Sequence, residues 1–259
     1  MLPAVHDTGA GEAVLFLHAF TMDASQWDHQ VAALSDGMRC VRIDLWGCGM
    51  SPPPPDDEPS LDGFASAVLD ALNARDIDRV AVVGISMGGY LAFALWRRAP
   101  ERIRALALCN TRATADSDAS RDDRLAMARQ VERDHSVESI VEPMVARLLS
   151  PDAQAEAHIV DPVRGRIRRC TPAGIAFAQR AMANRPDCSA LLASINVPAL
   201  IIAGTEDAII ATQEVHAMAD AIPGARYAEL ACGHLSNLEL PRAVNDHLAA
   251  FLAPARMAS

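Results

Sequence analysis

The chain has no apolar stretch long enough to cross a bilayer, and no basic segment followed by a long apolar core near its first residue. It also has no Cys-x-x-Cys pair, because its 6 cysteines are scattered. Without an export signal, such cysteines are expected to be reduced and mostly buried thiols. We therefore expect a cytoplasmic protein with no membrane partner, and nothing in the cysteine spacing suggests a metal site.

Basic residues are the minority among the charges, with 23 Lys and Arg against 33 Asp and Glu and a formal net charge of −10. This balance argues against nucleic acid or an anionic membrane surface as a partner and leaves a small molecule as the expected one. Hydrophobic residues make up 51% of the 259 residues, which is typical of a globular chain with a sizeable core. The length suits one large α/β domain with room for an inserted subdomain.

The most informative stretch is residues 80–90, Val-Ala-Val-Val-Gly-Ile-Ser-Met-Gly-Gly-Tyr. Residues 80–83 form a short β-branched run that suits a buried strand, and residues 90–98 favour a helix. Between them, the spacing of Gly84, Ser86 and Gly88 fits Gly-x-Ser-x-Gly. In so sharp a turn the flanking residues have room for almost no side chain, and the serine is held in a strained conformation that exposes its hydroxyl.

This strand, turn and helix resemble the nucleophile elbow of the α/β-hydrolase fold family. The resemblance implies a mostly parallel sheet of the eight-stranded type with flanking helices and an inserted helical cap. Residues 112–190 have no strand-like runs, and we assign them to a cap inserted after the sixth strand. Residues 1–111 and 191–259 would then form the core, with further strands expected at 13–17, 40–45, 105–109, 197–204 and 225–230.

Two further motifs resemble the acid and base of this family. Asp207 follows the expected strand at 197–204, with Glu206 as the competing carboxylate, and His234 follows a glycine after the strand at 225–230. With Ser86 they stand in the order nucleophile, acid and base that the fold uses. Asn110 occupies a position where some members carry the acid, but an amide is no anionic partner for a histidine.

The resemblance also implies an oxyanion hole made of the backbone N–H groups of Phe20 and Met87. The turn before Phe20 has Ala19 where the family usually has glycine, and a Cβ is tolerable there only if φ stays negative. We expect His18 in the same turn to be structural rather than catalytic.

The cap would line the substrate pocket together with Phe20. Within it, four apolar side chains either line that pocket or pack inside the cap: Met144, Leu148, Phe177 and Met182.

Taken together, the sequence predicts a serine-dependent carboxylic-ester hydrolase that forms an acyl-enzyme on Ser86 and uses no cofactor. Within the family it looks most like the group of small esterases, 3-oxoadipate enol-lactonases and perhydrolases. A lactonase and a carbon–carbon bond hydrolase are the alternatives, and a ligand receptor with an idle triad is a third. The acyl chain length, the stereoselectivity, the physiological substrate and the oligomeric state, a homodimer included, stay open.

Overall fold

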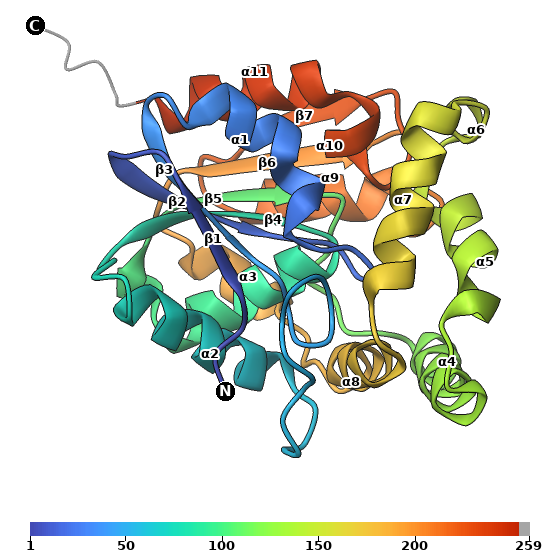
Figure 1. Ribbon diagram of the computed structural model, residues 1–259. Helices are drawn as coiled ribbons and strands as arrows, with labels where there is room; N and C mark the ends of the chain where they lie inside the picture. The colour runs from blue at the N-terminus through green and yellow to red at the C-terminus, as the bar shows by residue number, and fades with distance from the viewer. Residues whose placement is uncertain (254–259) are drawn as a thin grey trace, which may run out of the picture.

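The computed structural model describes residues 1–253 and shows a single mostly parallel sheet of seven strands (Figure 1). Their order is β1-β3-β2-β4-β5-β6-β7, and β1 alone runs antiparallel to its neighbour. The strands are β1 Val5–Thr8, β2 Glu12–Leu17, β3 Met38–Ile43, β4 Val80–Ile85, β5 Ile103–Cys109, β6 Ala199–Gly204 and β7 Arg226–Leu230.

The central strands are buried because helices cover both faces of the sheet. Every residue of β4 and β6 is buried, which explains why these segments read as continuous apolar runs rather than alternating ones. Helices α1 and α11 lie over one face, and α2 and α3 lie over the other (Figure 1). The helices of the core are α1 Asp28–Leu34, α2 Leu61–Asn73, α3 Met87–Arg98, α9 Thr212–Ala221, α10 Ser236–Glu239 and α11 Pro241–Leu252, with 3-10 turns η1 Ala24–Trp27, η2 Pro100–Arg102 and η3 Ser189–Ser194.

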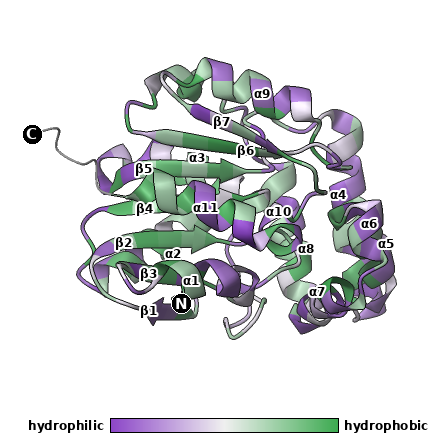
Figure 2. Cartoon of the chain, turned by 90° about the horizontal axis from the view of Figure 1, so that it is seen from above, coloured by the Kyte–Doolittle hydropathy of each residue, from purple (hydrophilic) through white to green (hydrophobic). Residues whose placement is uncertain are grey.

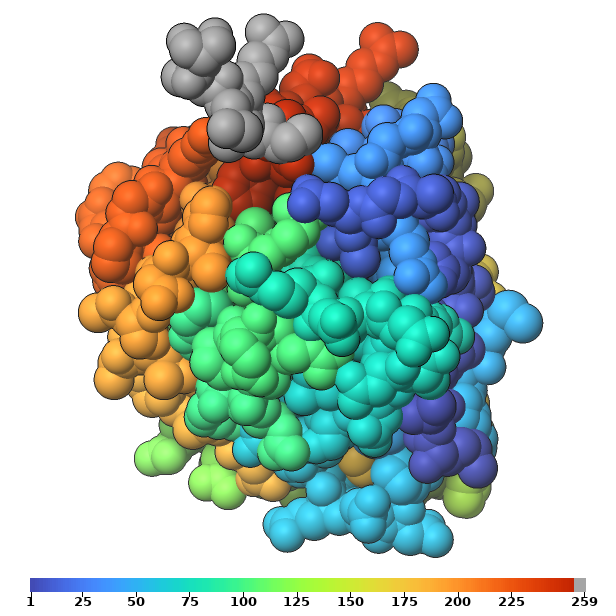
Figure 3. Space-filling model, turned by 90° about the vertical axis from the view of Figure 1, so that its left-hand side faces the viewer, coloured from blue at the N-terminus to red at the C-terminus, as the bar shows by residue number. Residues whose placement is uncertain are grey.

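Five helices connect β5 to β6 and occupy one end of the sheet, beyond the carboxyl ends of its parallel strands (Figure 2). They are α4 Asp118–Asp134, α5 Glu138–Leu148, α6 Pro151–Gln154, α7 Ala157–Arg169 and α8 Pro172–Ala183. Helix α4 packs on α8, and α5 packs on α7. Seen from the opposite side, these helices are almost entirely hidden behind the core (Figure 3). We call residues 112–190 the helical segment.

The structure confirms the expected fold class and the strand assignments, with two differences. The sheet has seven strands in residues 1–253 rather than eight, so the helical segment follows the fifth strand of this sheet, not the sixth. The sequence runs account for six strands, and the total of eight follows from the resemblance alone. Strand β1 was not expected, because its four residues, Val-His-Asp-Thr, include a single apolar side chain. The structure resolves the segment after β5 into separate helices, and two of them, α5 and α7, continue through an internal proline, Pro143 and Pro162.

No helix among the described residues is both long enough and apolar enough to cross a membrane. All six cysteines are buried and free. Burial raises the pKa of the Cys109 thiol to about 12, so this thiol stays protonated and unreactive at neutral pH.

A buried carboxylate, Asp116, joins the two ends of the helical segment, and its side chain is 1% exposed. It accepts from Nε of Arg124 at 2.6 Å, pairs with Nη1 of Arg185 at 2.7 Å, and accepts from Nη2 of Arg112 at 3.1 Å. Burial alone would raise the pKa of Asp116, but the bonds and charges of Arg185 and Arg124 overcome it and hold this pKa well below the usual range. The cluster ties the loop after β5 to α4 and to the chain after α8.

Replacing Asp116 with asparagine is expected to lower the free energy of unfolding by about 3–5 kcal/mol, because it leaves buried guanidinium groups without their counter-charge. Since the folded pKa is depressed, this contribution is complete above the unfolded pKa of about 4 and is lost as the pH falls towards the folded pKa. Urea unfolding followed by circular dichroism at pH 7 and at pH 3 measures both effects. Asp122→Asn, an exposed change on α4, is the matched control. A loss below about 1 kcal/mol at pH 7 would contradict the prediction.

Candidate active site

Ser86 lies at the turn between β4 and α3, with φ 54° and ψ −117°. Such a conformation costs a non-glycine residue about 1–3 kcal/mol and persists only where the surroundings enforce it. A Cβ on Gly84 would lie 2.4 Å from the carbonyl oxygen of Gly88, and a Cβ on Gly88 would lie 2.1 Å from that of Leu17. The two glycines therefore let the new helix pack directly on its own strand and on β2, which produces the strained turn that the sequence predicts.

His234 and Asp207 form a buried pair at the ends of β7 and β6. Nδ1 of His234 lies 2.7 Å from Oδ2 of Asp207, and both side chains are 1% exposed. The other oxygen of Asp207 accepts from the backbone N–H groups of Ile209 and Ile210, at 2.8 and 3.0 Å. Burial raises the pKa of Asp207, but the charge of His234 and these hydrogen bonds outweigh it and leave the pKa lowered. The carboxylate is thus ionised and fixed in place at neutral pH.

Of the two competing carboxylates, only Asp207 contacts the histidine. Glu206 is exposed, and the one hydrogen bond at that position joins its backbone N–H to the carbonyl oxygen of Cys232.

Asn110, which the sequence excludes as the acid, is nevertheless part of this arrangement. It lies at the end of β5 with φ 45°, and its Nδ2 donates to Oδ2 of Asp207 at 3.1 Å and to the carbonyl of Gly233 at 3.2 Å. This contact follows from β5 and β6 being parallel neighbours whose carboxyl ends meet at one edge. The sequence signal for the contact between Asn110 and Asp207 is that both residues follow predicted strands.

The backbone N–H groups of Phe20 and Met87 donate no hydrogen bond within residues 1–253. Ala19 is not among the residues with positive φ, so the condition that its Cβ imposes is met. The left-handed residue of this turn is Thr21, with φ 65°, and Ala19 is held by its N–H, which donates to Oε1 of Gln26 at 2.9 Å.

His18 is fully buried beneath this turn. Its Nδ1 donates to the carbonyl of Ala19 at 2.8 Å, and its Nε2 accepts from the N–H of Leu45 at 2.9 Å. Burial lowers the pKa of His18, so the ring is neutral and joins the turn after β2 to the loop after β3. It lies off the cavity, in agreement with the structural role expected for it.

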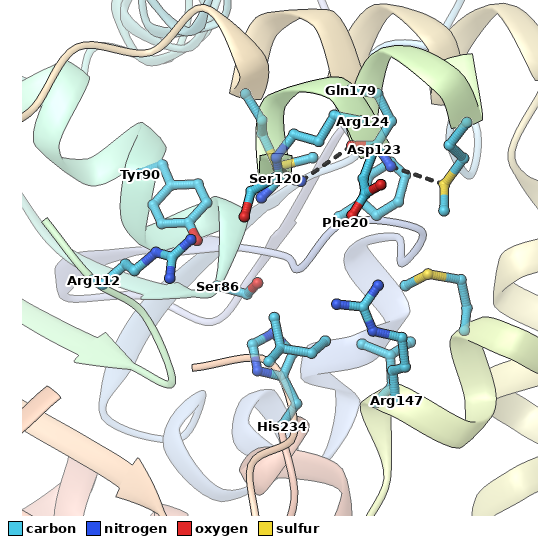
Figure 4. Close-up of a pocket in the computed structure, with 15 residues that line it drawn as sticks. Phe20, Ser86, Tyr90, Arg112, Ser120, Asp123, Arg124, Arg147, Gln179 and His234 are labelled. Carbon is cyan, nitrogen blue, oxygen red and sulfur yellow. Dashed lines mark hydrogen bonds between the residues drawn. The ribbon is translucent and has the colours of Figure 1, made fainter. Parts of the chain in front are cut away.

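Ser86 and His234 open into a cavity of about 170 Å³ beneath the helical segment (Figure 4). Its walls are formed by Phe20, Tyr90, Arg112, Ser120, Asp123, Arg124, Met127, Met144, Arg147, Leu148, Gln179, Met182 and Ile209. No group of three or more His, Cys, Asp or Glu side chains is placed to hold a metal ion anywhere in the part of the chain that the structure describes.

Of the five residues expected in the pocket, Phe20, Met144, Leu148 and Met182 lie on the wall of this cavity. Phe177 does not: its ring packs against Trp46 and Phe64, with centroid distances of 5.7 and 5.2 Å. Positions 177 and 182 of α8 differ by five residues, which places them about 140° apart around a helix. The two side chains therefore leave the helix in different directions.

The polar half of the wall was not expected from the sequence, where only apolar residues were considered. Arg147 lies on α5, three residues after Met144 and directly before Leu148, and all three side chains line the cavity. Arg124 lies on α4, four residues from Ser120. The spacing of four residues between Ser120 and Arg124 is a same-face spacing on a helix, but it does not show that this face meets the cavity.

The comparisons with known proteins agree with this geometry. A family model described as alpha/beta hydrolase fold matches residues 12–241. A 3-oxoadipate enol-lactonase of Acinetobacter baylyi is 30% identical over 230 residues, which is 88% of this chain and 84% of that protein.

Solved structures show the same relationship. A thermophilic esterase from Thermogutta terrifontis is 33% identical, with a TM-score of 0.92, and the match covers 96% of this chain and 92% of that one. An enol-lactonase from Burkholderia xenovorans is 30% identical with a TM-score of 0.89, covering 97% and 96%. Because both the family model and these relatives span most of its length, the chain belongs to the α/β-hydrolase fold family.

Proposed function

We propose that the protein is a serine-dependent carboxylic-ester hydrolase that works through an acyl-enzyme on Ser86. The observation that supports this best is that His234, which is bonded to the buried Asp207, shares one cavity with Ser86 on its strained turn (Figure 4). A serine hydroxyl needs a base to remove its proton as it attacks, and a histidine needs an orienting group to present the correct tautomer. The arrangement contains both.

In the proposed reaction, Nδ1–H of His234 stays hydrogen-bonded to Asp207, so Nε2 is free to take the proton of Ser86. The serine oxygen attacks the ester carbonyl, and the negative charge that develops on the carbonyl oxygen is stabilised by the N–H groups of Phe20 and Met87. His234 then gives its proton to the leaving alcohol. Water activated by the same nitrogen hydrolyses the acyl-enzyme and restores the serine.

We further propose that residues 112–190 act as a cap over this site. The end of α5 is joined to the loop that carries the base, because the carbonyl of Leu148 accepts from the N–H groups of His234 and Leu235, both at 3.1 Å. Met144 and Leu148 supply apolar wall on that side of the cavity. A cap of this kind excludes water and selects the substrate.

Lactone hydrolysis is the second candidate, and the enol-lactonase names of two of the relatives favour it. The same three residues would open a lactone, because a lactone is an ester whose alcohol remains attached to the acyl group. A carbon–carbon bond hydrolase and a ligand receptor are less well supported, since no feature of the described residues favours either.

A series of p-nitrophenyl esters from acetate to decanoate tests the proposal. We expect turnover with an optimum among the shorter acyl chains, because the cavity is small at about 170 Å³. A fluorophosphonate probe should label Ser86. Labelling without turnover of any ester in the series would favour the lactone reaction, whereas absence of both labelling and turnover would overturn the proposal.

A further inference from the structure

We propose that the substrate carries a carboxylate and that Arg147 binds it, as a specificity-determining residue. This inference rests on the proposed function and deepens it, because it names the class of ester or lactone that the cavity accepts. The proposed substrate class is an ester or lactone with a carboxylate on either its acyl or its alcohol side.

The first argument is the charge of the cavity wall. Three arginines line it, and two of them are already paired with acids. Arg112 pairs with Asp116 at 3.1 Å and with Glu214 at 3.3 Å, and Arg124 bonds Asp116 at 2.6 Å. Within residues 1–253, the guanidinium of Arg147 makes neither an ion pair nor a hydrogen bond, so its charge remains available to a ligand.

The second argument is direction. Figure 4 shows the guanidinium of Arg147 turned into the cavity, on the opposite side of Ser86 from Arg112 and close to His234 in the view. The backbone beside it is fixed relative to the base, since its neighbour in sequence, Leu148, accepts the hydrogen bond from the N–H of His234. Arg147 and the proposed base, His234, therefore lie on two backbone segments that are joined by a hydrogen bond. The side chain of Arg147 is exposed, so an incoming ligand can reach it.

The third argument is the match between the guanidinium group and a carboxylate. A guanidinium offers parallel N–H donors at the spacing of the two carboxylate oxygens, and such charge-assisted pairs are about twice as strong as neutral hydrogen bonds. The wall also contains an acid, Asp123, on α4. If the substrate were a cation instead, Asp123 would be the residue that selects it, and the experiment includes that outcome.

The experiment compares ester pairs of nearly equal size that differ in charge. Monomethyl glutarate against methyl valerate places the carboxylate on the acyl side, and acetoxyacetate against ethyl acetate places it on the alcohol side. Proton release in a pH-stat gives kcat/KM for each ester. The quantity of interest is the ratio of kcat/KM for the charged ester to that for its neutral partner.

We expect Arg147→Met to lower this ratio about 10- to 100-fold for one of the two pairs, mostly through KM, because one charge-assisted contact is lost. Arg147→Lys should retain part of the ratio, since it keeps the charge but not the fork. Arg129→Met, which removes an exposed arginine of α4 outside the cavity, is the matched control and should leave the ratio unchanged. A ratio unaffected by Arg147→Met, or one that responds only to Asp123→Asn, would overturn the inference.

A binding measurement separates this inference from the proposed function. Glutarate is titrated calorimetrically into Ser86→Ala, which has no nucleophile, and into the same variant carrying Arg147→Met. We expect binding at one site, weakened at least about 10-fold by the second change. Such binding would support Arg147 even if no ester were hydrolysed. Equal affinity in the two proteins, or no binding to either, would reject the inference while serine-dependent turnover of neutral esters left the proposed function intact.

Discussion

Ser86→Ala is expected to lower kcat for ester hydrolysis by about 10⁵- to 10⁶-fold, since losing the nucleophile of such a unit costs about as much as losing the whole unit. The fold should persist, because alanine occupies the same space and the backbone of the turn is enforced by its glycine neighbours. The rate with a p-nitrophenyl ester and the unfolding midpoint in urea measure the two effects. Ser66→Ala, on α2 and away from the cavity, serves as the control.

The second large effect is expected at Asp207. Asp207→Asn should lower kcat by about 10⁴-fold, because the amide can no longer hold Nδ1–H of the histidine and the ring is presented in the wrong tautomer. Glu206→Gln is the natural control, since it makes the same chemical change one residue away at an exposed position. We expect the control to retain its rate within about twofold.

The comparison of these two variants identifies the acid. If Glu206→Gln were the more damaging, the hydrogen bond between Asp207 and His234 at 2.7 Å would not be the catalytic one. If neither change reduced the rate more than about tenfold, the reaction would not depend on an oriented histidine. A fluorophosphonate probe should still label Asp207→Asn, but more slowly, because the serine remains in place while its activation is lost.

The parts of the site that the sequence could predict are those in which backbone geometry dictates residue type. The elbow is recognisable because close contact with the carbonyls of Gly88 and Leu17 excludes any side chain at two positions around Ser86. The ends of parallel strands likewise carry information. Ser86, Asp207 and His234 each follow a strand, and the carboxyl ends of parallel strands lie at one edge of the sheet. Assigning the strands was therefore enough to predict that the three residues lie near one another.

The cavity wall was harder to predict, because helix spacing alone does not define which face of a helix meets the site. Phe177 and Met182 are both buried on α8, yet only Met182 lines the cavity. A side chain packed among aromatic rings and one that lines a pocket are both apolar residues at helical spacing, so the sequence does not distinguish them. Arg147 was missed for the converse reason, since an arginine on an amphipathic helix is usually solvated and only the three-dimensional placement shows where it points.

The two hydrogen bonds from His234 and Leu235 to the carbonyl of Leu148 also bear on how this enzyme could be re-engineered. Grafting an entire foreign helical segment would change the position of the backbone carbonyl that holds the loop of the base, so such chimaeras should lose turnover with every substrate alike. Exchanging only α4 keeps that junction, and the packing of α4 is against α8 rather than against the sheet. Libraries directed at Ser120, Asp123 and Met127, the cavity-lining residues of α4 outside the Asp116 cluster, are therefore the economical route to new selectivity. In the last turn of α5, the position of the backbone has to be kept, while its side chains can be varied.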